Sequence, residues 1–195
     1  MRKPSLGLSK AQIGKIIASA LAEDLGSGDI TTELLIPLEL RGRACIVVRG
    51  KGVLAGIGVA AEVFRRVDPL LQFRGLVSDG SKAHPGDVAA TIEGSAASIL
   101  RAERTALNFL QHLSGIATET ARYVEAVSGL GTKIFDTRKT IPGLRPLGKY
   151  AVRVSGGYNH RQSLGDGIQI CQSENAISIV TRNFEEHQPC ADQVK

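Results

Sequence analysis

The feature that most constrains the fold of this chain is a short apolar run that ends abruptly in charge. Ile134 and Phe135 lead directly into the segment 136–140, which reads Asp-Thr-Arg-Lys-Thr. The apolar pair predicts a short buried strand. In α/β folds, the carboxyl ends of such strands present chemically active side chains at one edge of a sheet. Adjacent guanidinium and ammonium groups suit a ligand that carries carboxylates or phosphates.

The segments around this strand predict repeated β/α units. Apolar residues recur at helical spacing over 99–127, with Gly115 as an interruption, and a shorter helix is expected over 147–154. After the Ser-Gly-Gly turn at 155–157, the apolar run 167–171 predicts another strand. Strand, helix and strand in this order favour parallel strands joined by helices, as at the start of a barrel or a doubly wound sheet.

The first hundred residues predict a smaller, mixed unit of helices and strands. Apolar residues at helical spacing predict helices over 8–25 and 59–67. Between and after them come four β-rich runs, separated by turns that contain glycine or proline: 43–48, 53–55, 72–77 and 88–93. This pattern predicts a compact α+β unit that closes before position 100.

Positive charge is concentrated in the second half of the chain. The window 101–161 holds ten Lys or Arg against four acidic residues, although the net charge of the whole chain is only +5. A basic patch can bind nucleic acid or a small polyanion. Aromatic residues make up only 4% of the chain and Trp is absent, so few side chains could stack on bases. We therefore expect a small anionic ligand rather than nucleic acid.

Composition and the number of cysteines also indicate in which cellular compartment the protein is expected. Hydrophobic residues at 43% and charged residues at 22% are typical of a globular protein with a buried core. Since no apolar run is long enough to cross a bilayer, we expect no membrane partner. The three cysteines are too few and too scattered for a disulfide framework or a zinc site. A reducing cytoplasm is the expected location.

One glycine motif allows a different interpretation. The segment 56–61 matches the G-x-G-x-x-A dinucleotide fingerprint, and Asp79 follows at about the distance of a ribose-binding carboxylate. However, the strand expected before the motif is very short, and glycines before a helix often serve only close packing. The match is weak evidence for a dinucleotide site.

Three dipeptides carry the candidate functional groups: Glu103–Arg104 on a predicted helix, Arg138–Lys139 at a predicted strand end, and His160–Arg161 after a glycine turn. Each alone is weak, because a helical Glu-Arg pair is usually a solvated surface pair and a single histidine is usually structural. Together they suggest a site that binds several anionic groups. Histidine is the only one of these side chains whose ordinary pKa permits proton exchange near neutrality.

Several long motifs in order resemble one family, quinolinate phosphoribosyltransferase, also called nicotinate-nucleotide pyrophosphorylase (carboxylating). The resemblance covers roughly 8–170. The motifs are LAEDLGSGDITT at 21–32, ERTALNFL at 103–110, LSGIAT at 113–118, DTRKTIPGLR at 136–145, KYAV at 149–152 and GGYNHR at 156–161.

The resemblance implies an α/β (α+β) class: an N-terminal α/β sandwich domain over 1–112, then the start of an open β/α barrel over 113–170. It implies a homodimer that joins quinolinate to 5-phosphoribosyl 1-diphosphate with Mg²⁺ and forms nicotinate mononucleotide, diphosphate and CO₂. By motif, substrate would be bound by six residues: Arg104 from the partner subunit, Thr137, Arg138, Lys139, His160 and Arg161. Lys139 and Glu103 would be catalytic, with Glu103 orienting Arg104.

The chain departs from the family pattern near its end. Cys171 occupies the place of a substrate-contacting lysine, and 171–195 is expected to be a divergent tail beyond the point where the resemblance stops. The magnesium ligands of the family are expected in later barrel strands. Two alternatives therefore stand beside the enzyme: a catalytically inactive, truncated relative that acts as a dimerising or interaction protein, and a paralogue with another phosphoribosyl acceptor.

Overall fold

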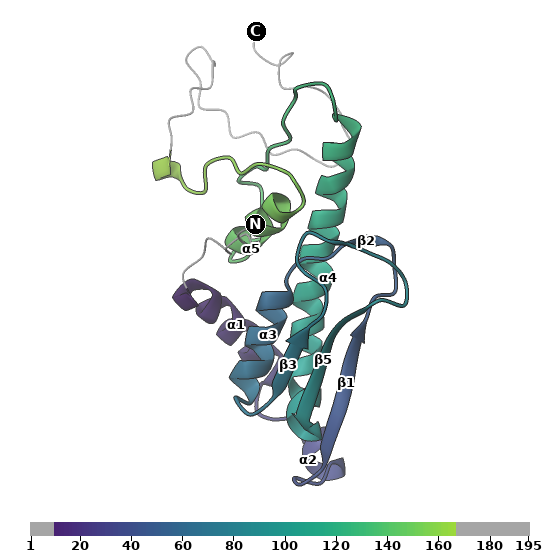
Figure 1. The fold of residues 1–195 in the computed structure, drawn as a ribbon. Helices are drawn as coiled ribbons and strands as arrows, with labels where there is room; N and C mark the ends of the chain where they lie inside the picture. Colours follow the sequence, from purple (N-terminus) through teal and green to yellow (C-terminus); the bar gives the residue numbers. More distant parts are fainter. Residues whose placement is uncertain (1–9, 167–195) are drawn as a thin grey trace, which may run out of the picture. The chain divides into compact units, whose positions relative to one another are not determined.

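A three-stranded antiparallel sheet forms one layer of the N-terminal half (Figure 1). In the computed structural model, which describes residues 10–166, its order is β1 (Arg41–Val47), β5 (Val88–Ser95), β3 (Gln72–Gly75). The predicted strands 43–48, 72–77 and 88–93 are therefore confirmed, with small shifts at their ends. Side chains alternate along β1, so that Ala44 faces the core opposite Ile92 of β5.

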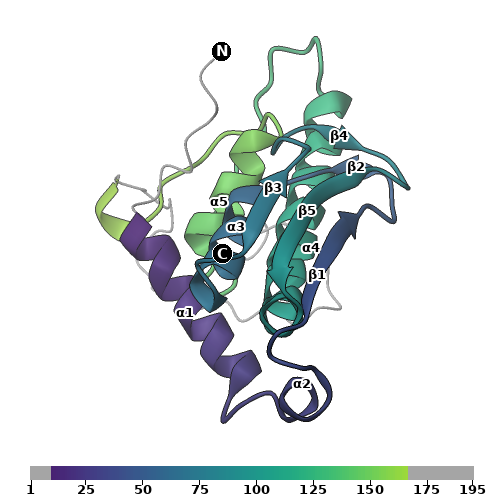
Figure 2. The same cartoon turned by 60° about the horizontal axis from the view of Figure 1, so that its bottom comes forward.

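Helices cover one face of this sheet and make the second layer. α3 (Ile57–Val67) and α4 (Ala96–Ala126) pack against the strands, and α1 (Lys10–Leu25) packs against both helices (Figure 2). Their apolar faces meet in a core in which Phe64 is 2% exposed and Leu113 is fully buried. The expected N-terminal α/β sandwich is confirmed. Its hydrophobic core is where most of the folding free energy arises.

α4 is one continuous helix of 31 residues, so the predicted interruption at Gly115 is wrong. A mid-helix glycine costs only about 1 kcal/mol relative to alanine. Tertiary contacts on either side of it hold the helix. The hydroxyl of Ser114 accepts a hydrogen bond from the backbone N–H of Ala55 at 3.0 Å, and Thr118 accepts from Val53 at 2.9 Å. α4 therefore runs unbroken across 112–113, where the domain boundary was expected, and the boundary itself stays a prediction.

A small second sheet explains the glycine motif at 56–61. β2 (Gly52–Val53) pairs antiparallel with β4 (Lys82–Ala83), so the motif does not follow a parallel strand. Gly56 caps α3 in the left-handed region at φ 104°. The first N–H of α3, on Ile57, donates to the carboxylate of Asp79 at 2.9 Å. Asp79 thus occupies the position where a dinucleotide phosphate would bind, and the dinucleotide interpretation is wrong.

A short helix, α2 (Ile30–Leu35), connects α1 to the sheet. Asp29 caps it, because its carboxylate accepts a hydrogen bond of 3.0 Å from the backbone N–H of Thr32. Most apolar side chains of α2 and of the turn after it point outward: Leu34 is 77% exposed and Leu38 is 80% exposed.

The chain after α4 forms a minimal parallel strand pair and α5 (Arg145–Val154). Phe135 and Tyr158 form a single parallel bridge. The strand predicted at 133–135 is thus reduced to this bridge. Its predicted burial is wrong, because Phe135 is 52% exposed. A strand needs neighbours on both sides and both faces to bury its side chains, and among the described residues this pair has one neighbour each.

The chain divides into two compact units, 1–162 and 163–195. The described part of the second unit contains one short 3₁₀ turn, Leu164–Asp166. The strand predicted at 167–171 and the expected tail lie outside the described residues. Within the described part of the chain, no helix combines the length and the apolarity needed to cross a membrane.

Candidate anion-binding site

The parallel bridge brings two functional segments to the same edge. The N–H of Tyr158 donates to the carbonyl of Ile134 at 2.8 Å, and the N–H of Asp136 donates back to the carbonyl of Tyr158 at 3.0 Å. Because the two short strands run parallel, the segments 136–140 and 159–162 both leave from their carboxyl ends. Charged residues that follow the two strands therefore leave from the same edge.

Asp136 is the centre of a buried hydrogen-bond network that joins these segments. One carboxylate oxygen accepts from Lys149 Nζ at 2.5 Å and from the backbone N–H of His160 at 2.7 Å. The other accepts from Asn159 Nδ2 at 2.6 Å. Lys149 also donates to the carbonyl of His160 at 3.0 Å, so α5 is connected to both segments. The backbone at His160 is thereby fixed beside the start of 136–140.

Arg145 makes a second connection between the same segments. Its guanidinium donates to the hydroxyl of Thr140 at 3.0 Å, to the carbonyl of Gln162 at 3.0 Å and to the carbonyl of Arg138 at 3.4 Å. A planar fork with five N–H donors can serve three acceptors at once, which a lysine ammonium cannot do in the same geometry. Arg145 therefore orders the strand ends and uses its donors on the protein itself.

A hollow of about 270 Å³ lies beside these strand ends. Side chains from three elements line it: His112 and Ile116 of α4, Thr137 and Lys139 of the strand end, and Val152 of α5. Thr137 accepts a hydrogen bond of 3.0 Å from the backbone N–H of Lys139, which forms a tight turn at the rim. The hollow has the size of a small-ligand subsite rather than of a complete binding pocket.

Arg138 is half-buried, and its Nε is a buried donor without a hydrogen-bond partner among the described residues. An unpaired buried donor costs free energy, and a bound anion would satisfy it. The wider segment 136–161 contains six Lys or Arg and a single acidic residue, Asp136. Since Asp136 is paired with Lys149, the net character of the edge is cationic.

The structure brings together most of the predicted site residues. Thr137, Arg138 and Lys139 lie at one strand end, and His160 and Arg161 follow the adjacent one. Their assignment to particular substrate groups stays a prediction.

Glu103 and Arg104 do not join this group. Both are exposed on α4. Arg104 lies twelve residues before Ile116, which is about 18 Å along a helix. No ion pair joins Glu103 to Arg104 within the described residues. The orienting role expected of Glu103 therefore stays a prediction.

Sequence reasoning gave no role to Lys149, Asn159 or Arg145. A signal for Lys149 was present: a lysine lies among the apolar residues of α5, and it is only 4% exposed. A buried lysine requires a counter-charge, and Asp136 is the only acid in 136–161. The contacts of Asn159 and Arg145 carried no such signal, because their acceptors lie 5 to 23 positions away in the chain and no local pattern identifies them.

No cluster of three metal-ligating side chains forms among the described residues. Mg²⁺ takes oxygen ligands in octahedral geometry. Both oxygens of Asp136 already accept hydrogen bonds from protein donors.

A sandwich followed by parallel strand ends that gather cations defines an anion-binding α/β protein. Comparison with known families agrees and is more specific. Residues 29–114 match the quinolinate phosphoribosyl transferase N-terminal domain, and residues 116–191 match the C-terminal domain of the same family. The chain belongs to the quinolinate phosphoribosyltransferase family. The match to residue 191 corrects the expectation that the resemblance stops near 170.

Individual relatives support this assignment. A probable nicotinate-nucleotide pyrophosphorylase (carboxylating) of Synechocystis is 41% identical over 173 residues, which cover 87% of this chain and 58% of the relative. The nicotinate-nucleotide pyrophosphorylase (carboxylating) of Mycobacterium leprae is 48% identical over 84% of this chain and 58% of its own length. The crystal structure of NadC from Streptococcus pyogenes superimposes with a TM-score of 0.81 at 45% identity, over 84% of this chain and 58% of that one. The chain thus spans somewhat more than half the length of these relatives.

Proposed function

We propose that the protein is a quinolinate phosphoribosyltransferase that supplies the biosynthesis of NAD. It would join quinolinate to 5-phosphoribosyl 1-diphosphate and release diphosphate and CO₂, with nicotinate mononucleotide as the product. One observation carries the proposal: the parallel bridge places the segments of Arg138–Lys139 and His160–Arg161 at the same strand edge, where Thr137 and Lys139 line a small hollow. The names of the relatives support the same reaction.

The chemistry of the substrate fits this edge. Quinolinate carries two carboxylates, and in the proposal Arg138, His160 and Arg161 bind them while Thr137 and Lys139 line the pocket. Charge-assisted hydrogen bonds to arginine are strong and directional, so they orient the pyridine ring as well as holding it. The buried, unpaired Nε of Arg138 supports a role in contacting a carboxylate.

The proposed reaction depends on positioning and electrostatics. The ring nitrogen attacks the anomeric carbon as diphosphate leaves, which makes the pyridine ring a cation. The positive ring then stabilises the electron pair that departing CO₂ leaves on the ring carbon, and a proton from water adds to that carbon to give nicotinate mononucleotide. Fixed cations that bind the ring carboxylates and neutralise the leaving diphosphate would supply much of the rate. Lys139, as the exposed cation on the rim of the hollow, is the proposed catalytic residue on this unit.

Mg²⁺ is part of the proposal for the whole protein. Its ligands are proposed to lie outside residues 10–166, and none of the steps above depends on it. We also propose a cytoplasmic location, in keeping with a free, exposed cysteine at Cys45.

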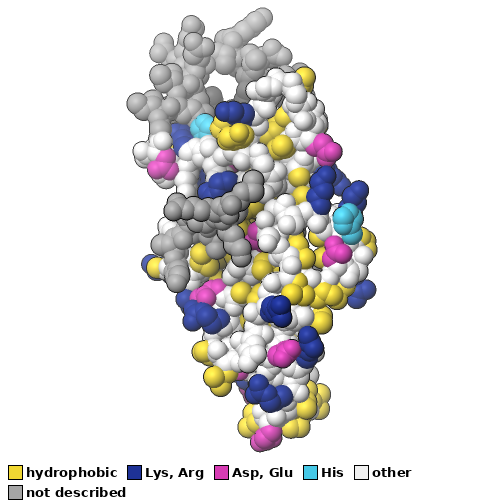
Figure 3. Space-filling model, in the orientation of Figure 1, with side chains coloured by type: hydrophobic (Ala, Val, Ile, Leu, Met, Phe, Trp, Pro, Cys, Tyr) yellow, Lys and Arg dark blue, Asp and Glu magenta, His cyan; other side chains and the backbone are white. Residues whose placement is uncertain are grey.

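We propose that a second copy of the chain completes the site by supplying Arg104. The outward position of Arg104, distant from the strand ends of its own chain, supports this. Beside it lies an exposed apolar surface formed by Ile30, Leu34, Leu35 and Leu38 of α2 and the following turn (lower end of Figure 3). Arg101, one turn before Arg104, contacts Glu33 of α2 at 3.5 Å, so the arginine and the apolar surface share one face. Burial of these leucines against a second copy would stabilise a dimer.

The test uses purified protein with quinolinate, 5-phosphoribosyl 1-diphosphate and Mg²⁺, with nicotinate mononucleotide measured as the product. Quinolinate binding is measured in parallel by calorimetry on the 195-residue chain. We expect Arg138→Ala to abolish binding, while Arg122→Ala, which removes an exposed arginine paired only with Glu119 on α4, leaves it unchanged. Binding without turnover would instead support the inactive relative, and no binding would contradict the proposal.

A further inference from the structure

We infer that Lys149 is a positioning residue that neutralises Asp136 and so keeps a carboxylate compatible with an anion-binding site. The substrate named here rests on the proposed function, but the charge argument applies to any anion bound at the strand ends. Asp136 and Lys149 both line the hollow, but their charged groups bind each other and neighbouring protein groups. They act on the ligand through the residues that bind it.

The pair is buried and close. The side chain of Lys149 is 5% exposed and that of Asp136 is 7% exposed, and Nζ lies 2.5 Å from Oδ1. Every other ion pair in the described part of the chain has at least one partner that is more than a third exposed. An exposed ion pair contributes little to stability, but a buried charge without its partner is costly. Lys149 and Asp136 are therefore coupled far more strongly than the surface pairs.

The location of the pair gives it a second role. Asp136 directly precedes Thr137 and Arg138, so its negative charge lies beside the groups proposed to bind carboxylates. An unpaired carboxylate at this point would repel a dianion, because charges interact strongly where water is excluded. With Lys149 in place, Asp136 can accept hydrogen bonds from His160 and Asn159 without this penalty.

The network also explains why an ion pair is present rather than an apolar contact. Asp136 accepts a hydrogen bond from the backbone N–H of His160, and the ammonium group of Lys149 donates to the carbonyl of the same residue. An apolar pair could fill the space, but it would leave these backbone groups of His160 without partners, and the amide of Asn159 would keep only the carbonyl of Lys149 as an acceptor. The ion pair gives these groups hydrogen-bond partners, and the net charge of the pair itself is zero.

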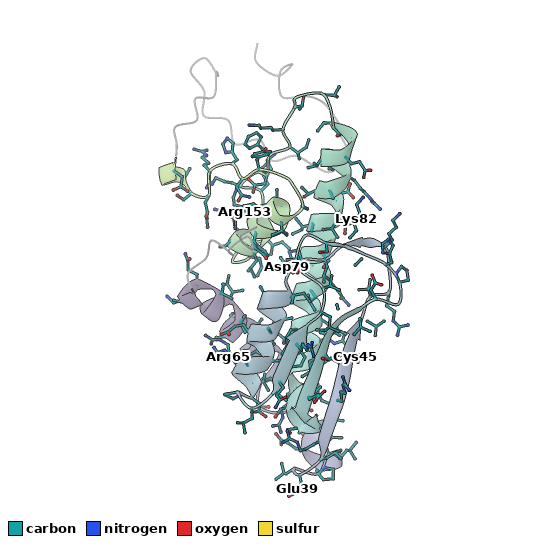
Figure 4. The ribbon with its side chains drawn as sticks, in the orientation of Figure 1. Glu39, Cys45, Arg65, Asp79, Lys82 and Arg153 are labelled. Atoms are coloured by element: carbon teal, nitrogen blue, oxygen red, sulfur yellow. The ribbon has the colours of Figure 1, made fainter. Side chains whose placement is uncertain are left out.

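The test measures anion binding by four proteins: wild type, Lys149→Met, Asp136→Asn and the double variant. Lys82→Met serves as a control, because Lys82 is an exposed lysine on β4 (Figure 4). Each is titrated by calorimetry with quinolinate, with nicotinate as a monoanion of the same ring, and with inorganic phosphate. Circular dichroism and thermal unfolding record whether each variant is folded.

We expect Lys149→Met to weaken quinolinate binding at least about tenfold, and nicotinate binding less, because the uncompensated Asp136 repels the dianion more strongly. The double variant carries neither charge and should bind quinolinate better than Lys149→Met does. A purely structural role predicts the same loss of affinity for quinolinate and nicotinate, because it does not depend on the charge of the ligand. If Lys149→Met does not fold, the double variant still should, and it should retain a preference for quinolinate over nicotinate.

The results separate the two proposals. If wild type binds phosphate but not quinolinate, the proposed function fails, and the same comparison among the four proteins is made with phosphate. If the double variant is no better than Lys149→Met, or if Lys149→Met binds like wild type while folded, the inference is overturned. If wild type binds none of the three anions, both proposals fall.

Discussion

Tyr150 donates a hydrogen bond of 2.6 Å to the carboxylate of Asp79, which lies 71 positions earlier in the chain. The other oxygen of Asp79 accepts from the N–H of Ile57 at the start of α3. One carboxylate therefore connects the sandwich to α5 (Figure 4). Because Lys149 is the next residue on α5, this contact fixes the helix that holds the strand-end network in place.

Replacing Tyr150 by Phe should lower the free energy of unfolding by about 1–2 kcal/mol, because a buried carboxylate oxygen loses its donor while the ring and its packing are kept. Chemical denaturation of both proteins measures the difference. Tyr123→Phe is the matched control, since Tyr123 is 58% exposed. Equal stability of wild type and Tyr150→Phe would show that the contact contributes nothing.

The stability difference between these two proteins should also depend on pH. Burial raises the pKa of Tyr150, and the hydrogen bond to Asp79 and its negative charge raise this pKa further. The phenol of an unfolded chain ionises near pH 10. Since the folded pKa is the higher one, the stabilisation is complete below about pH 10 and is lost as the pH rises towards the folded pKa. The advantage of wild type over Tyr150→Phe should therefore shrink between about pH 10 and 11 in thermal unfolding. A constant difference would contradict this.

Gly80 should tolerate no side chain. It has φ of 85°, and a Cβ there would collide with the carbonyl oxygen of Val154 on α5. Gly86 has a similar φ of 94° but open space around it. Gly86→Ala should therefore cost about 1 kcal/mol from backbone strain alone, and Gly80→Ala at least about twice that, because the clash adds to the strain. Unfolding curves of the two variants separate these terms, and equal effects would argue against the close approach.

Mixing two inactive variants of the whole protein should restore activity if Arg104 acts in the partner's site. A dimer that combines Arg104→Ala with Arg138→Ala has one site with both arginines intact and one with neither. After subunit exchange we expect up to about a quarter of wild-type turnover, because half of the dimers are mixed and each has one intact site. Each variant alone should be inactive. No recovery, with mixed dimers confirmed by mass, would place Arg104 outside the site.

The sequence was informative where local rules decide the structure. The helices over 8–25, 59–67 and 147–154 and the strands of the larger sheet followed from periodicity and turns. The two-residue strand β4 was missed, because Lys82 and Ala83 show no pattern at that length. Gly115 was misjudged, since contacts of Ser114 and Thr118 with residues some sixty positions earlier outweigh a local propensity.

The candidate site was predictable only where its residues lie in local sequence motifs. Arg138, Lys139, His160 and Arg161 stand out as charge in motifs, and the structure gathers them. Asp79 was considered only as a ribose ligand, on weak evidence, although it caps α3 and binds Tyr150. Its role depends on two long-range partners that no spacing rule identifies. Lys149 could be found only by asking what neutralises a lysine on an apolar helix face.

Because α4 is continuous, insertions and deletions within it are restricted. The helix carries Arg104 near one end and lines the hollow at the strand ends with His112 and Ile116. Each residue of a helix advances the chain by about 1.5 Å and turns it by about 100°. Inserting one residue between Arg104 and His112 would leave both segments helical yet swing Arg104 to another side of the molecule. Arg104 and the part of α4 that lines the hollow therefore keep a fixed rotational relationship, and length changes between them are restricted to those that preserve it.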